Sequence, residues 1–454
     1  MERRFEVRKE ELLADCRVPP EVFSGMMQRL VRFAEPFVAL LCREEQREHA
    51  QMYLRGLLSD LQRKNAESIA YRHDEDRMGL QLFIGMSPWD HRPHLEELTR
   101  QVGQELGEAD GVLVFDPSAF AKKGRHSVGV ARQWCGRLGK QENCQVAVFL
   151  GYVSRREHAL VDARLYLPKE WVKDRNRCRA CGVPRQEIRL HTRHELALEM
   201  LDRNGPFLPH AWIAGDDEMG RPAWFRRELT ARGERYLLAV PSNTTIRDRE
   251  AEPPDYGGRG RKPQVRFQQV RTWCESMPVD VWTKVEVRDG EKGPLEVEIL
   301  QRQVLAKIER KVGPEETLVV IRSRDDEGKV KLDYLLSNAP ADTPLTEFAR
   351  VASAEHRIEE CIKRGKSEAG MAQYQVRTWI GWHHHITLSL IATWFLLREA
   401  RRGKKMDPGN HCAPDPSAIC SNPAQRMSVR HHPSHPARMR APLGTERACS
   451  AVSP

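Results

Sequence analysis

The chain has 454 residues and a formal net charge of +9, with 40% hydrophobic and 30% charged residues. This length allows two or three domains, or one large domain with insertions, and the composition is that of a soluble protein with a real core. The longest apolar run, 386–397, is too short to span a bilayer, which excludes a membrane-spanning helix there. The net positive charge is compatible with a nucleic-acid partner but does not establish one. Residues 398–454 contain ten basic and four acidic residues, so about +6 of the +9 lies in this tail and the rest of the chain is only mildly basic.

The N-terminus, MERRFEVRKEELL, is too charged for a signal peptide, and the eleven cysteines have irregular spacings. We therefore expect reduced thiols and a cytoplasmic protein without a membrane partner.

The first hundred or so residues are predicted to be helical. Apolar residues recur with helical spacing between Met26 and Leu41, and 94–106 is a further predicted helix. The stretch 53–70 interleaves basic and apolar residues. Two interpretations stay open: a module that binds DNA, or a bundle that only packs on the next domain.

Strands are predicted from residue 112 onward. The segments 112–115, 127–136, 144–154 and 158–168 read as consecutive strands joined by hairpins. A polar segment follows at 169–192. Helices at 193–204 and 221–232 then alternate with strands at 211–220 and 236–240, which predicts an α/β fold.

The second half is predicted to contain a β-rich block, preceded by a loop and followed by helices. Residues 242–270 are rich in Gly, Pro, Asp and Arg and read as a loop. Four strands are predicted at 279–287, 295–308, 317–323 and 331–338, followed by helices from 348 to about 402. Beyond Lys405 the composition predicts disorder.

Three acidic residues occur in contexts that suggest a metal site. Asp116 ends the apolar run VLVF, where Pro117 is expected to stop the strand, and a buried carboxylate is costly unless it is paired or holds a metal. An ordinary Asp-Pro turn is the alternative. Asp216 follows the apolar AWIAG, and Glu359 lies on a predicted helix seven residues before Lys366. Such acids are the parts of a two-metal phosphoryl-transfer site, although 64 acidic residues allow many similar selections.

Several long motifs resemble those of insertion-sequence transposases of the DDE superfamily, the type with a β-rich insertion between the second Asp and the Glu. DPSAFAKKGRHSVGVARQWCGRLGKQENCQVAV (116–148) resembles the first catalytic segment, and WIAGDDEMG (212–220) resembles the second. The stretch 358–396 resembles the third, and 53–70 resembles the N-terminal region. The resemblance covers roughly residues 50 to 405.

The resemblance implies that Asp116, Asp216 and Glu359 are the catalytic, metal-binding triad. Asp216 is preferred to Asp217 because the family has glycine four positions after the acid, here Gly220. Glu359 is preferred to Glu360 because the family's Glu-x6-Lys spacing then falls on Lys366. The wider hairpin-forming group has Tyr-x2-Arg-x3-Glu-x6-Lys, and this chain departs from it with Ala352 and Glu355.

The implied fold is an RNase H-like mixed sheet flanked by helices. We predict a helical N-terminal domain at 1–108, the first part of the catalytic core at 109–241, the β-rich insertion at 242–345 and C-terminal core helices at 346–405. The implied cofactors are two Mg²⁺ ions, with Mn²⁺ as an alternative. The implied partners are double-stranded DNA, as element ends and target, and a second copy in a homodimeric synaptic complex near the bacterial nucleoid.

The DNA contacts implied by the resemblance involve Lys122, Lys123 and Lys366 on phosphates, with Arg377 and Trp282 as further candidates. Packing inside a sheet is the favoured alternative for Trp282 and for Trp273, and helix packing is as plausible as DNA contact for Tyr374 and Arg377. Cys178-x2-Cys181 lacks a second pair at zinc spacing and is read as free thiols. His383, His384 and His385 begin an apolar helix and are expected to be structural.

Residues 406–454 do not resemble the family. Met406 and Asp407 permit a +1 reading that begins with Trp, and the family commonly continues with Trp-Thr-Pro. We hypothesise a frameshifted ending, which sequencing of the locus would test.

The sequence therefore predicts a DDE transposase that cuts the ends of its own element and joins them to target DNA. The alternatives are a catalytically inactive DNA-binding relic and an RNase H-like endonuclease that does not transpose.

Overall fold

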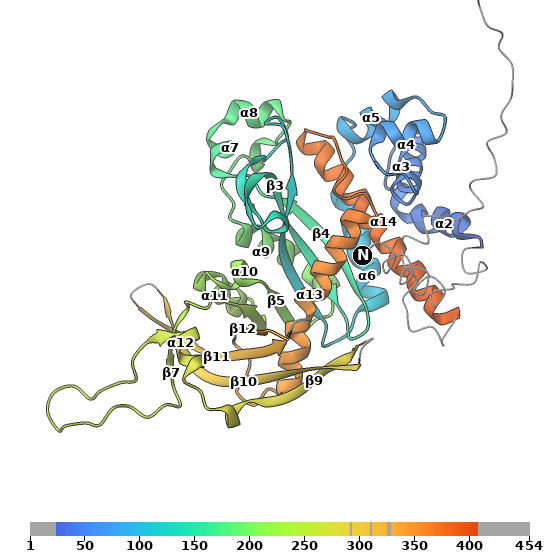
Figure 1. Cartoon of the computed structure of the whole chain (residues 1–454). Coiled ribbons are helices and arrows are strands. Elements are labelled where there is room, and N and C mark those ends of the chain that lie inside the picture. Colours follow the sequence, from blue (N-terminus) through green and yellow to red (C-terminus); the bar gives the residue numbers. More distant parts are fainter. Residues whose placement is uncertain (1–23, 291–292, 309–310, 325–327, 407–454) are drawn as a thin grey trace, which may run out of the picture.

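The computed structural model describes residues 24–290, 293–308, 311–324 and 328–406 (Figure 1). The frameshift hypothesis falls on residues that lie, apart from the end of the last helix, outside this range.

The described helices are α2 (Met26–Val38), α3 (Glu44–Leu57), α4 (Ala66–Arg72), α5 (Arg77–Gly85), α6 (Arg92–Leu106), α7 (Lys169–Lys173), α8 (Arg175–Ala180), α9 (Arg193–Asn204), α10 (Asp217–Gly220), α11 (Ala223–Ala231), α12 (Val270–Glu275), α13 (Leu345–Ser367) and α14 (Trp379–Met406). The strands are β1 (Val112–Ala121), β2 (Ala131–Cys135), β3 (Lys140–Val153), β4 (His158–Leu165), β5 (Trp212–Gly215), β6 (Tyr236–Ala239), β7 (Thr245–Asp248), β8 (Gln268–Gln269), β9 (Thr283–Gly290), β10 (Gly293–Ile308), β11 (Lys311–Arg324) and β12 (Val330–Ser337).

The centre of the fold is a mixed sheet of RNase H-like type, as predicted. Strand β3 pairs antiparallel with both β4 and β1, and β1, β5 and β6 run parallel to one another. The helices between parallel strands supply the crossover connections that such pairs need. One of them, α9, begins with a capping box in which Thr192 and Glu195 satisfy each other's backbone N–H groups.

Strand β1 continues past the acid that was expected to end it. Asp116 pairs with Phe149 and Pro117 pairs with Val148, so the strand runs on to Ala121. Its parallel neighbour β5 already ends at Gly215, opposite Phe115. Beyond that point β1 has an open edge on one side, where a residue without a backbone N–H is tolerated. The expectation that Pro117 terminates the strand was wrong for this reason.

The β-rich block extends the central sheet. Strand β12 pairs with β6, and β11, β10 and β7 follow in order, so that the described part of the chain forms one sheet of twelve strands. Alternate residues of β11 enter two different cores: Val319 faces the main core, and Val320 joins a second apolar cluster around Trp273 of α12. The segment 242–270, read from sequence as a loop, contributes the short strands β7 and β8.

The N-terminal helices belong to the main core. Figure 1 shows α2 to α6 gathered along α14, and the rings of Phe33 and Phe395 lie 5.2 Å apart. Trp394 donates a hydrogen bond to Gln101 at 3.1 Å. The proposed domain boundaries stay a prediction. Among the described residues, no helix is long and apolar enough to cross a membrane.

Candidate active site

The first two predicted acids lie on neighbouring parallel strands. Phe115 of β1 is in register with Gly215 of β5; Asp116 is the next residue on β1, and Asp216 directly follows the end of β5. Because parallel strands have their carboxyl ends at the same edge of a sheet, this register places the two carboxylates together at that edge.

Asp216 is fixed in place and Asp217 is not. The Asp216 carboxylate caps α10 by accepting a hydrogen bond from the Met219 N–H at 2.9 Å. Asp217 is exposed and pairs with Arg221 at 3.1 Å. Gly220 ends the turn where a β-carbon would stand 1.9 Å from the carbonyl oxygen of Ala239. Only glycine lets α10 lie this close to β6, which explains the glycine four residues after the acid.

Helix α13 carries the third acid across the sheet. It comes very close to β3 at Gly151, where an added β-carbon would be 2.3 Å from Cδ1 of Ile358. Ile358 is fully buried, so the neighbouring Glu359 points away from the core and into the cavity beside Asp116. This cavity has a volume of about 1370 Å³ and is lined by Asp116, Asp216, Asp217, Glu218, Glu359 and Lys366, among others.

A fourth carboxylate lies one helical turn before Glu359. Glu355 is half-buried and, in the described part of the chain, has no hydrogen bond or ion pair. Burial, reinforced by the negative charges of Asp216, Glu359 and Asp116, raises its pKa to about 8. The spacing of four residues on one helix was the signal for it in the sequence, where Glu355 was read only as a departure from a signature.

Burial and neighbouring carboxylates raise the pKa values of Asp116 and Asp216. Burial, then the charges of Asp216 and Glu359, raises the pKa of Asp116 to about 8. Burial raises the pKa of Asp216 to about 7 even though the Met219 N–H stabilises its charged form. Carboxylates that are expensive to ionise together form a site whose charge a cation would relieve.

Lys366 is held by β1. Its Nζ donates to the Ser118 hydroxyl at 2.8 Å and to the Ala119 carbonyl at 3.1 Å, and it lies 4.5 Å from the centre of the Phe120 ring. Its charge therefore has a fixed position at the cavity wall, where it lowers the pKa of Asp116 against the other influences.

The donor set fits hard divalent cations. In the described residues, no three acidic, His or Cys side chains are arranged to hold an ion on their own. Magnesium commonly binds through one or two carboxylates and completes its shell with water and substrate phosphates, so that this arrangement of acids suits it. Among the described residues that line the cavity, the carboxylates are those of Asp116, Asp216, Asp217, Glu218 and Glu359, and no Cys or Met is present. The one imidazole, that of His194, hydrogen-bonds the Glu218 carbonyl.

Comparison with known proteins identifies the family. A family model described as DDE superfamily endonuclease matches residues 36–294, which is more than half of the chain. The chain belongs to the DDE superfamily endonucleases. This confirms the predicted superfamily, and the matched range includes Asp116 and Asp216 but ends before Glu359.

Two further comparisons show what the chain is similar to. The "Probable transposase for insertion sequence element IS701" of Microchaete diplosiphon is 36% identical over 94 residues, which are 20% of this chain and 25% of that protein. The match thus spans a quarter of that relative's length. A piggyBac transposase, solved as a synaptic complex with hairpin DNA, aligns with 89% of this chain and 78% of its own, with a TM-score of 0.38 and 11% identity.

The residues predicted to contact DNA differ in how exposed they are in this DDE superfamily chain. Lys123 and Arg377 are exposed. Lys122 instead lies over the buried Tyr374, with Nζ 3.2 Å from the ring centre, and burial lowers its pKa to about 7. Trp282 is half-buried under Arg322, 4.3 Å from the ring centre, and packs on the second apolar cluster. Lys122 and Trp282 therefore both make packing contacts within the chain. Their contact with DNA stays a prediction.

The three consecutive histidines are structural, as expected. His384 lies between the carbonyls of Ile84 and Trp89, with its ring stacked 3.6 Å from that of Trp89. Burial lowers the pKa of His383 to about 3 and of His385 to about 3, which keeps both neutral. They join α14 to the N-terminal helices.

The Cys178 and Cys181 thiols are free. The Cys178 Sγ lies 3.1 Å from the carbonyl oxygen of Trp171, and the Cys181 Sγ lies 3.6 Å from that of His126.

Other cavity-lining residues were missed by sequence reasoning. Arg193 pairs with Glu218, and His194 contacts the Glu218 carbonyl at 2.9 Å, so both fix the wall that follows Asp216. Trp134 of β2 is 58% exposed at the cavity rim. No local pattern marks these residues, because they reach the cavity from strands and helices distant in sequence.

Proposed function

We propose that this chain is a transposase that cuts DNA at the ends of its insertion sequence and joins the resulting 3′-OH ends to target DNA. The observation that carries the proposal is the meeting of Asp116, Asp216 and Glu359 from β1, the end of β5 and α13 at one cavity. An RNase H-like sheet with acids at these places suits phosphodiester chemistry, and the matched relative is named as a probable transposase.

Asp116, Asp216 and Glu359 would hold two divalent cations, Mg²⁺ or Mn²⁺. The bound ions would stabilise charge on the attacking and leaving oxygens during in-line phosphoryl transfer. Glu355 is included in this acidic set because it lies one turn before Glu359 and shares its electrostatic environment. Lys366 would orient a phosphate, since its ammonium group is fixed against β1. The homodimeric synaptic complex, the roles of Lys123 and Arg377 and the domain division belong to the same proposal.

The test is cleavage and strand transfer with candidate element ends in Mg²⁺. We expect Asp116→Asn, Asp216→Asn and Glu359→Gln each to lower the cleavage rate by about 10³-fold, because each removes several kcal/mol of transition-state stabilisation. Glu360→Gln is the matched control for Glu359→Gln: Glu360 is the next residue on α13 and pairs with Arg364 at 2.6 Å outside the cavity.

The outcomes separate the alternatives. Unchanged cleavage in all three variants would refute the site. Cleavage without joining would favour a non-transposing endonuclease, and DNA binding without either reaction would favour an inactive relic.

A further inference from the structure

The loop between β7 and β8, residues 249–267, projects from the insertion strands. Figure 1 shows it extending away from the sheet at the far left, and every residue from Ala251 to Lys262 is exposed. Such a loop buries little apolar area of its own. Loops of this length without secondary structure are uncommon in compact proteins and are commonly functional. A function of this loop would therefore involve contact with another molecule.

The tip of this loop is basic and thin. It reads Tyr-Gly-Gly-Arg-Gly-Arg-Lys-Pro (256–263), with three cations and no acid. Gly258 and Gly260 have φ values of 77° and 82°, which only glycine adopts easily, and no atom lies within 4 Å of where their β-carbons would be. The glycines keep the backbone slim without any neighbour in the chain that requires it.

The cations of the tip are free to meet a ligand. In the described part of the chain, Arg259, Arg261 and Lys262 have no ion pair, nor does Arg266 at the returning side. The acids of the loop, Glu250, Glu252 and Asp255, all precede the tip in the sequence.

The base of the loop is anchored. The Arg247 guanidinium lies 4.2 Å from the centre of the Phe267 ring and donates to Gln264 at 2.7 Å. Glu250 is neutralised by Arg302 at 2.6 Å. The loop thus presents a basic tip on a fixed base.

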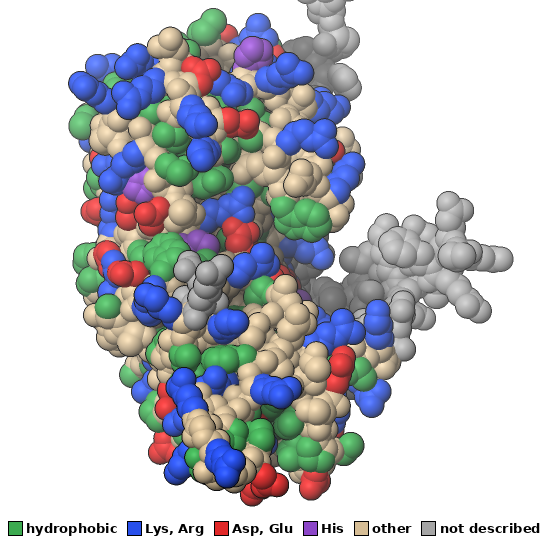
Figure 2. All heavy atoms as spheres, turned by 90° about the vertical axis from the view of Figure 1, so that its left-hand side faces the viewer, with side chains coloured by type: hydrophobic (Ala, Val, Ile, Leu, Met, Phe, Trp, Pro, Cys, Tyr) green, Lys and Arg blue, Asp and Glu red, His purple; other side chains and the backbone are tan. Residues whose placement is uncertain are grey.

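A polar path connects this base to the candidate active site. A second cavity of about 630 Å³ at the start of β7 is lined by Ser242, Thr244, Lys307 and Arg221. Arg221 also lines the active-site cavity. Figure 2 shows Lys and Arg side chains spread over the face that includes the insertion strands. DNA held at the acids would continue past Arg221 toward the loop.

We propose that the β7–β8 loop binds the minor groove of A·T-rich duplex DNA beside the cleavage site, an inference that rests on the proposed function. The minor groove is about 6 Å wide, which excludes a helix but admits a slim backbone bend of the kind that Gly258 and Gly260 form, held by the Tyr256 hydroxyl on the Gly260 carbonyl at 3.0 Å. Narrow A·T-rich grooves have enhanced negative potential that attracts inserted arginines. Arg259 and Arg261 enter the groove, and Lys262 contacts the phosphate at its edge.

The experiment measures binding of the full-length protein to labelled duplexes by fluorescence anisotropy, in EDTA so that no cleavage occurs. Three duplexes of equal length carry A·T, G·C or inosine·C pairs in the tested segment. Inosine·C pairs present the major groove much as G·C pairs do but lack the amino group that G·C pairs place in the minor groove. We expect the wild type to bind the A·T and inosine·C duplexes about tenfold more tightly than the G·C duplex.

The variants distinguish groove insertion from simple charge attraction. Arg259→Ala/Arg261→Ala should bring the A·T to G·C ratio close to one. Arg259→Lys/Arg261→Lys is the matched control for charge, and we expect it to keep overall affinity while losing most of the ratio. The loop is exposed, so unchanged melting curves will verify that both variants fold.

Several results would overturn the inference. If the inosine·C duplex binds like G·C, the A·T preference does not come from the minor groove, and if the Lys variant keeps the full preference, it does not come from Arg259 and Arg261. If the wild type binds no duplex at all, the inference and the proposed function fail together; DNA binding without an A·T preference removes the inference alone.

Discussion

At the residue scale, four carboxylates share one region of the sheet although each alone would be better solvated in water. Asp116, Asp216 and Glu355 are half-buried, and Glu359 opens into the cavity. The chain compensates partly with the Met219 N–H and the fixed ammonium group of Lys366. Burial, together with the remaining repulsion, raises the pKa values of Asp116, Asp216 and Glu355, from which we expect the stability of the metal-free protein to depend on pH.

We predict that, without metal, the carboxylates of the site lower the free energy of unfolding progressively as pH rises from about 4 to about 8. The folded pKa values, about 8 for Asp116 and for Glu355 and about 7 for Asp216, exceed the unfolded values. The folded state then holds more protons than the unfolded state in this range, so that the free energy of unfolding falls with increasing pH. Below the unfolded values both states are protonated and the effect vanishes.

Urea denaturation in EDTA at pH 5.5, 7 and 8.5 tests this prediction. Because other groups also titrate, the comparison is between the wild type and Glu355→Gln. The variant should be more stable at pH 8.5 by on the order of 2 kcal/mol, and by much less at pH 5.5. Added Mg²⁺ should stabilise the wild type more than the variant at pH 8.5. A difference that does not change with pH would contradict the assigned environment of Glu355.

At the element scale, the position of α13 depends on its close approach to β3. We predict that Gly151→Ala destabilises the protein by about 1–3 kcal/mol, because the new methyl group collides with Ile358 and α13 must move. The shift would displace Glu355 and Glu359, so cleavage and Mg²⁺ affinity should fall with stability.

The compensating variant Gly151→Ala/Ile358→Ala removes the collision. Because Ile358→Ala itself removes buried apolar contacts, thermal melting should show a loss in the double variant that is smaller than the sum of the two single losses, and Mg²⁺ affinity should follow the same pattern. If the double variant is worse than the sum of both single changes, the close approach is not the cause.

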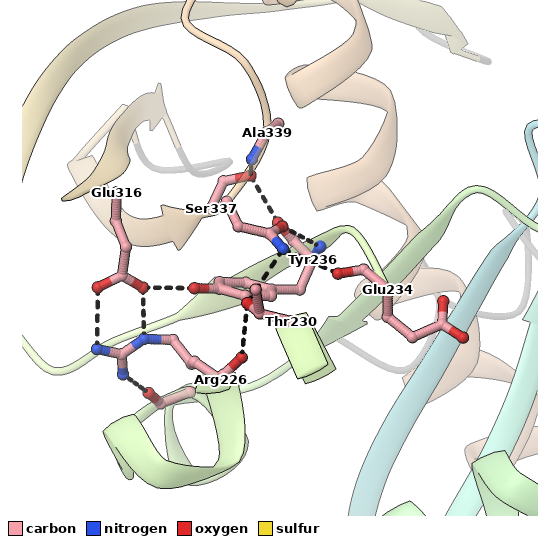
Figure 3. A network of polar contacts seen from close by, with 9 residues as sticks. Arg226, Thr230, Glu234, Tyr236, Glu316, Ser337 and Ala339 are labelled. Atoms are coloured by element: carbon pink, nitrogen blue, oxygen red, sulfur yellow. Dashed lines mark hydrogen bonds and ion pairs between the residues drawn. The ribbon is translucent and has the colours of Figure 1, made fainter. Parts of the chain in front are cut away.

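The helices after Asp216 are joined to the insertion by a buried polar network (Figure 3). Arg226 of α11 pairs with Glu316 of β11 at 2.7 Å, and Tyr236 of β6 donates to the same carboxylate at 2.6 Å. Arg226 also donates to the Gly220 carbonyl at 2.5 Å, at the end of the turn that begins with Asp216. The network therefore links the insertion to the second acid.

We predict that Glu316→Gln lowers the free energy of unfolding by about 3–5 kcal/mol, because it leaves the Arg226 charge buried without its partner. Arg226→Met/Glu316→Met should be less harmful than Glu316→Gln, since no buried charge remains. Chemical denaturation of both variants tests the ranking, and an equal or greater loss in the double variant would contradict it.

At the scale of the whole molecule, a single apolar core joins the N-terminal helices, the central sheet and α14. We predict that a chain starting at Glu108 does not fold, because α14 loses contacts such as Phe33 on Phe395 and Trp89 on His384. Expression followed by circular dichroism and melting tests this. A soluble truncated chain with a cooperative transition would instead favour an independent N-terminal module.

The sequence by itself determined most strands, the longer helices and the order of the acidic motifs, because apolar periodicity and motif spacing are local properties. It therefore identified Asp116, Asp216 and Glu359 as candidates before any contact was known. Only the tertiary structure decided that β1 runs through Pro117, that the insertion extends the sheet through β12, and that Lys122 is covered by Tyr374. For Glu355 the spacing of four residues from Glu359 is a local signal, but its place among the acids follows from how α13 packs on β3 at Gly151. These features depend on which distant segments share a sheet edge or a core, and no local pattern records that pairing.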